Sequence, residues 1–252
     1  MLSDILFTPS AFNWMLICLS AFVSGLSKAG IKGIDMLNVT IMAIVFGGKA
    51  STGVVLPLLC VADVMAVIYY HRHAQWSHFR RIIPWIIGGI IIGVIVGKDL
   101  NEYYFRKIMA IIIVSTVAIM LMLEFRKKII VPTNKLFVGS TGLAAGFTTM
   151  IGNLAGAFSN IYFLAIRAPK NNFIGTAAWL FLVINFFKLP FQAFYWKNIT
   201  GSSLRVDLFL LPALIAGFWV GVKLAAAIKD NSYRKIVIAL TLMGAILIFF
   251  KK

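Results

Sequence analysis

Apolar residues gather in long runs along this chain, and short polar stretches separate them. About ten such runs can be traced, at residues 11–27, 34–47, 51–70, 82–97, 105–123, 136–150, 154–166, 173–195, 206–227 and 234–250. Most of them come near the roughly 18 to 20 residues that a helix needs to cross a bilayer. The pattern therefore predicts an all-α polytopic membrane protein.

Two of the runs, 34–47 and 154–166, are short for a span, and each follows a glycine-rich break. "KAGIKG" precedes the first run and "MIGNLAG" precedes the second. Short or interrupted segments at corresponding places in two halves are typical of transporters that are built from a repeat. We therefore expect broken helices at both places.

The two halves of the chain match when they are aligned. Residues 84–108 align with residues 212–236 without a gap. This alignment pairs identical residues: Pro84 with Pro212, Gly89 with Gly217, Gly93 with Gly221, and Arg106-Lys107-Ile108 with Arg234-Lys235-Ile236. Nearer the start of each half, Gly25 falls near Gly146 and Asp63 falls on Asn185.

We interpret residues 1–130 as a first membrane repeat and residues 131–252 as a second. Since five segments per repeat is an odd number, the second repeat is expected to be inverted, with a substrate site near the midplane between the two.

Composition agrees with a membrane protein and changes the meaning of the net charge. Hydrophobic residues make up 61% of the chain and charged residues 13%, whereas about a quarter of a soluble domain is charged. The formal charge of +16 lies mainly in short loops, where Lys and Arg set orientation and contact anionic lipid headgroups. We therefore expect membrane lipids, and no nucleic acid, as partners of this charge.

The side of the membrane that holds Arg72, Arg80 and Arg81 has the larger excess of basic residues. This excess predicts that the side is cytoplasmic and that both termini are outside.

Several stretches, taken in order, resemble one known family. They are "SGLSKAG", "LPLLCVAD", "IIPWIIGGIIIG", "FIGTAAWLF", "INFFKLP" and "LLPALIAGFWVG". Over nearly its whole length the chain resembles the sulfite exporter TauE/SafE family of membrane permeases. The resemblance implies secondary transport, with export as the expected direction, of sulfur-containing anions such as sulfite, thiosulfate or organosulfonates. The expected location is a cell membrane, such as the inner membrane of a prokaryote.

The stretch "SGLSKAGIKGID" is the first half of the predicted anion site. A broken helix exposes backbone N–H groups and the positive end of a helix dipole, and glycines let the backbone approach a ligand. Here Gly30 and Gly33 would supply the backbone, while Lys28 and Lys32 would supply charge. Lys28 also falls on the family's motif. The alternative is an interfacial turn whose lysines reach out to headgroups.

The matching stretch "TTMIGNLAG" would form the other half of the site. Thr148, Thr149 and Asn153 would provide neutral donors, and Gly152 would open the backbone.

Two ionisable residues lie deep within apolar runs, Asp63 and Lys188. Lys188 is three residues beyond Asn185, so both share one helix face. Such groups usually mark a pathway, a proton relay or a buried pair. Three hypotheses stay open: an Asp63–Lys188 ion pair between the repeats, a direct role in handling substrate or protons, or a position near the membrane interface.

No enzymatic, metal or cofactor site is expected. His71, His73 and His78 do not have the spacing of a common zinc site, so we interpret this stretch as a solvated loop. The sequence contains neither a glycine-rich nucleotide-binding loop nor a recognisable set of catalytic residues. Two alternatives to a transporter remain, a channel-like anion pore and a membrane enzyme or assembly factor that acts on a lipid or sulfur carrier. The sequence is compatible with a homo-oligomer but does not specify one.

Overall fold

The long apolar runs form helices, because a backbone in lipid has to satisfy its hydrogen bonds within its own segment. The computed structural model describes residues 10–125, 134–230, 232–233 and 235–240, and within these ranges every regular element is helical. The α-helices are α2 (Ala11–Lys28), α3 (Asp35–Phe46), α4 (Gly48–Tyr70), α5 (Trp76–Lys98), α6 (Glu102–Phe125), α7 (Lys135–Gly152), α8 (Ala155–Ala165), α9 (Lys170–Pro190) and α10 (Gly201–Ala227). A 3-10 turn (His71–His73) extends α4, and a π-helical turn (Phe191–Tyr195) extends α9.

Among the described residues, five helices are long and apolar enough to cross a membrane: α2, α4 with its 3-10 turn, α5, α9 with its π turn, and α10. The chain is therefore a membrane protein. The first nine predicted segments each overlap one of the helices α2 to α10, in chain order. The tenth, 234–250, lies largely outside the described residues.

The two short segments do not span on their own. Helix α3 has 12 residues and α8 has 11, which at 1.5 Å per residue gives about 18 Å, well short of the roughly 30 Å hydrocarbon core. Instead, α3 folds back along α2, where the Ser20 hydroxyl donates to the side-chain oxygen of Asn38. Helix α8 follows α7 in the same way and contacts it closely. Each predicted broken helix is thus a hairpin with one long and one short arm.

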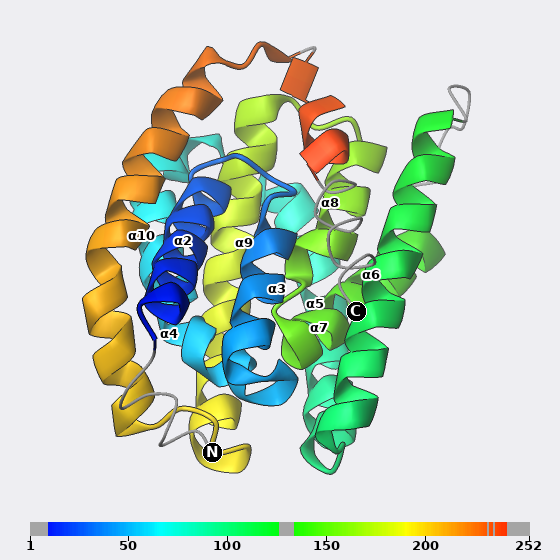
Figure 1. The fold of residues 1–252 in the computed structure, drawn as a ribbon. Coiled ribbons are helices and arrows are strands. Elements are labelled where there is room, and N and C mark those ends of the chain that lie inside the picture. The colour runs from blue at the N-terminus through cyan, green and yellow to red at the C-terminus, as the bar shows by residue number, and fades with distance from the viewer. Residues whose placement is uncertain (1–9, 126–133, 231, 234, 241–252) are drawn as a thin grey trace.

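Glycines hold two helix pairs unusually close. Helix α2 packs along α10, and α5 packs along α7 (Figure 1). At Gly25, Gly217, Gly89 and Gly146, a β-carbon would lie closer than 3.0 Å to a backbone carbonyl oxygen of the opposite helix. Only glycine fits there, so these helices meet through their backbones.

Helices α4 and α9 run antiparallel through the middle of the bundle (Figure 1). Gly53 near the start of α4 packs on Asn198 just after α9, while Gly175 near the start of α9 packs on His73 just after α4. Between these ends, the two helices bring Asp63 and Asn185 together in the interior. The α4–α9 pair therefore supplies the centre of the site.

Candidate functional site

The first break, Ala29–Ile34, joins α2 to α3. Gly30 and Gly33 have φ angles of +122° and +96°, values that L side chains rarely adopt, so the turn depends on glycine. Two tyrosine hydroxyls hold the turn from outside: Tyr70 donates to the carbonyl of Ala29, and Tyr233 donates to the carbonyl of Gly30, each at 2.8 Å. The break is therefore an ordered turn inside the bundle rather than an interfacial loop.

The second break is shorter. Asn153, at φ +55°, ends α7 in the left-handed conformation that asparagine tolerates, and α8 begins two residues later. Its side-chain amide nitrogen donates to the carbonyl of Thr52 on α4 at 3.0 Å. Leu154, the N-cap residue of α8, has no side-chain acceptor for the first N–H groups of the helix. These groups can therefore bind an acceptor from elsewhere.

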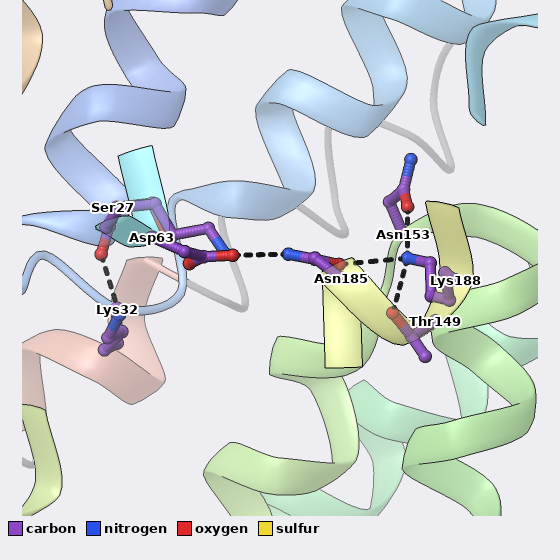
Figure 2. A network of polar contacts seen from close by, with 8 residues as sticks. Ser27, Lys32, Asp63, Thr149, Asn153, Asn185 and Lys188 are labelled. Atoms are coloured by element: carbon purple, nitrogen blue, oxygen red, sulfur yellow. Dashed lines mark hydrogen bonds and ion pairs between the residues drawn. The ribbon is translucent and has the colours of Figure 1, made fainter. Parts of the chain in front are cut away.

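A chain of polar contacts connects the two breaks through α4 and α9 (Figure 2). The Lys28 ammonium lies 2.6 Å from Oδ1 of Asp63. Asn185 donates to Oδ2 of Asp63 at 2.6 Å and accepts from Lys188 at 3.1 Å. Asp63 and Lys188 are fully buried, and Lys28 is nearly so. Asn185 is the link, because its amide offers a donor to the carboxylate and an acceptor to the ammonium.

Lys188 is bound to the second break. Besides Asn185, its ammonium donates to the hydroxyl of Thr149 at 3.0 Å and to the side-chain oxygen of Asn153 at 2.6 Å (Figure 2). All three of its donors are thereby used. Of the hypotheses for Asp63 and Lys188, the direct ion pair is wrong, because Asp63 pairs with Lys28; a role in handling substrate or protons stays a prediction. Lys188 lies one helical turn beyond Asn185, toward the end of α7, and so it meets Thr149 and Asn153 instead.

Lys32 is the least satisfied of the three buried lysines. It is 2% exposed, and its ammonium donates to the carbonyl of Ser27 at 3.0 Å. The ammonium groups of Lys28 and Lys32 lie 4.5 and 5.2 Å from the ring centre of Phe181, where the negative face of the ring stabilises a cation. Among the described residues no carboxylate forms an ion pair with Lys32.

A cavity of about 30 Å³ lies between the two breaks. This is room for a water molecule or two. The residues that line it come from both hairpins and from α4 and α9: Ser27, Lys28, Lys32, Asp35, Asn38, Val39, Leu59, Thr149, Asn153, Ala155, Gly156, Phe181 and Asn185. Both α3 and α8 begin at this cavity, and the positive ends of their dipoles favour an anion there.

Most of the predicted site residues meet at this cavity. Lys28, Lys32, Thr149, Asn153 and Asn185 line it, and Asp63 and Lys188 join it through hydrogen bonds.

The remaining predicted residues shape the turns and do not line the cavity. Gly30 and Gly33 bend the first break, Thr148 donates to the carbonyl of Leu154 in the second, and Gly152 packs near Leu154. Asp35, Asn38 and Phe181 line the cavity although they were not predicted to do so. Asp35 ends the stretch "SGLSKAGIKGID", and its charge beside the glycines was the available signal.

Comparison with known proteins agrees with the resemblance seen in the sequence. The model of one family, sulfite exporter TauE/SafE, matches residues 15–248, nearly the whole chain. No curated protein and no solved structure matches it. Because this match covers nearly the whole chain and the structure has membrane-spanning helices, the chain belongs to the sulfite exporter TauE/SafE family of membrane transporters.

Proposed function

We propose that this protein is a secondary transporter that exports small sulfur-containing anions, such as sulfite, thiosulfate or organosulfonates, from a cell. The observation that carries the proposal is the cavity between the hairpins, with Lys28 and Lys32 on its wall and two helix N-termini at its edge. Membership of a transporter family supports it.

Lys32 is the main cation available to an anion. Asp63 already neutralises Lys28, and Lys188 spends its three donors on Thr149, Asn153 and Asn185. Among the described residues Lys32 donates one hydrogen bond, to a carbonyl oxygen, so two of its N–H bonds remain for an oxyanion. Because the cavity has room for little more than water, binding a larger anion requires the hairpins to move apart.

We also propose that residues 1–130 and 131–252 are inverted repeats. The reciprocal packing supports this, since α2 of the first half packs on α10 of the second, while the corresponding α7 of the second half packs on α5 of the first. Basic residues at the end of the bundle where α4 ends, among them Arg72, Arg80 and Arg167, support a cytoplasmic location for that end.

The membrane potential favours export. A negative-inside potential drives an anion outward by about 2.3 kcal/mol per charge per 100 mV, so an exporter of this kind needs no coupling ion.

Flux in proteoliposomes tests the proposal. The purified full-length protein should give saturable flux of sulfite, thiosulfate or methanesulfonate, with chloride and sulfate as comparison anions. Lys32→Met should reduce saturable flux at least tenfold, whereas Lys107→Met, which removes an exposed lysine, should leave it unchanged. Flux that does not saturate and shows no exchange would indicate a channel. Parental flux in Lys32→Met would place the site elsewhere.

A further inference from the structure

Asp35 brings a carboxylate to a cavity that otherwise attracts anions. It is the first residue of α3, and its Oδ1 accepts a hydrogen bond from the backbone N–H of Gly33 at 3.0 Å. Its Oδ2 lies over Gly156 in the first turn of α8, where a β-carbon would come closer than 3.0 Å to it. The side chain therefore reaches from the first hairpin to the second.

This carboxylate lies where an anion would be expected to bind. The N-cap residue of α8, Leu154, offers no side-chain acceptor, and the dipole of the helix favours negative charge at its start. Asp35 forms no ion pair within the part of the chain that the structure describes. Its charge still lies close enough to stabilise the Lys32 ammonium electrostatically, and it also acts on whatever enters the cavity.

Charge balance at the cavity follows from the five ionisable groups in and around it. Lys28, Lys32 and Lys188 outnumber Asp35 and Asp63 by one, so the set carries at most one net positive charge. A singly charged anion is therefore the most that this set can neutralise. A doubly charged anion would leave a net negative charge in a buried site, and uncompensated buried charge is costly.

We propose that Asp35 determines the charge selectivity of the site, so that it accepts singly charged oxyanions, such as bisulfite and organosulfonates, over doubly charged ones. The inference rests on the proposed function and names its substrate class. It makes a quantitative prediction, because the Coulomb energy between Asp35 and a bound anion is proportional to the charge of the anion. If removal of the Asp35 charge strengthens binding of a monoanion by one factor, binding of a dianion should strengthen by about the square of that factor.

Asp35→Asn is the direct test, since it removes the charge and keeps the shape and the acceptor for Gly33. Binding of methanesulfonate (one charge) and thiosulfate (two charges) would be measured by thermal stabilisation of the purified full-length protein and by flux competition. If methanesulfonate binds roughly threefold tighter to the variant, thiosulfate should bind roughly tenfold tighter. Asp99→Asn, which removes an exposed carboxylate, is the matched control and should change neither affinity.

Three outcomes would overturn the inference: no gain, weaker binding, or equal gains for the two anions, which would indicate steric relief instead of charge. A parent protein that binds both anions saturably, with an unchanged preference in Asp35→Asn, would contradict the inference and leave the proposed function standing. A parent that binds neither would contradict both.

A second variant tests the position of the carboxylate. Gly156→Ala should displace the Asp35 carboxylate from the start of α8, because the added methyl overlaps the flexible end of that side chain. It should therefore change the preference between methanesulfonate and thiosulfate in the parent but not in an Asp35→Asn background. An equal change of preference in the two backgrounds, or no change in the parent, would overturn the inference.

Discussion

Replacing Asp63 by Asn tests the central ion pair most sharply. The Lys28 side chain is 9% exposed and the Asp63 side chain 0%, and their charged atoms are 2.6 Å apart. Asn keeps the shape of the side chain but leaves the Lys28 ammonium buried without a counter-charge. Breaking a buried pair in this way costs roughly 3–5 kcal/mol. At roughly 2–4 °C per kcal/mol for a chain of this size, we expect the melting temperature to fall by roughly 6–20 °C.

Adding Lys28→Met to Asp63→Asn should restore much of that loss, because it removes the orphaned charge. Adding Lys188→Met instead should not, because Lys188 bonds to Thr149, Asn153 and Asn185 and would leave those groups unpaired. The second double variant is therefore the control for the first.

Thermal unfolding of the purified protein in detergent, with sulfur anions removed, is the assay. The anions have to be absent because a bound ligand raises the melting temperature by mass action. Strictly additive losses for Lys28→Met and Asp63→Asn would refute the pairing. Recovery with Lys188→Met in place of Lys28→Met would refute the order of contacts through Asn185.

Two further predictions concern stability away from the cavity. Gly146→Ala should lower the melting temperature clearly, since its β-carbon would overlap a carbonyl of α5 and overpacking costs about 1–3 kcal/mol; Gly201→Ala, which has open space around it, should not. Burial raises the pKa of Glu102, but hydrogen bonds from Arg106 and from the backbone at the start of α4 lower it more, so the net pKa lies below its ordinary 4.5. The ionised Glu102 side chain should therefore stabilise the protein above pH 4.5, and this stabilisation should be lost as the pH falls through the lowered pKa of Glu102. The difference in melting temperature between the parent and Glu102→Gln should accordingly vanish on acidification. A difference that persists unchanged at low pH would contradict this role.

The sequence predicted the helices and the breaks because both depend on local features. The length of an apolar run determines whether a helix can span, so 34–47 and 154–166 were recognised as too short. The glycines that aligned between the two halves, such as Gly89 and Gly217, prove to be points of backbone contact between helices. Close approach requires glycine whatever the neighbouring sequence, which is why these positions stood out.

Partners within the site were harder to predict. The sequence places Lys188 and Asp63 at similar depths, but it does not show that Asn185 lies between them or that the α2–α3 hairpin brings Lys28 to the carboxylate. Asp35 was overlooked for a similar reason. An acidic residue at a helix start has a local explanation, and only the three-dimensional structure brings it against Gly156.

The backbone contacts at glycine limit how this molecule can change shape. Sliding α2 along α10, or α5 along α7, would drive main-chain atoms into each other, so each pair should move as a rigid body. Each rigid body combines a helix from residues 1–130 with one from residues 131–252. If the proposed transport proceeds by alternating access, it therefore cannot be a simple rocking of one half of the sequence against the other. In such a cycle the short arms α3 and α8, which begin at the cavity, would be better placed to swing aside and admit the anion to each side of the membrane in turn.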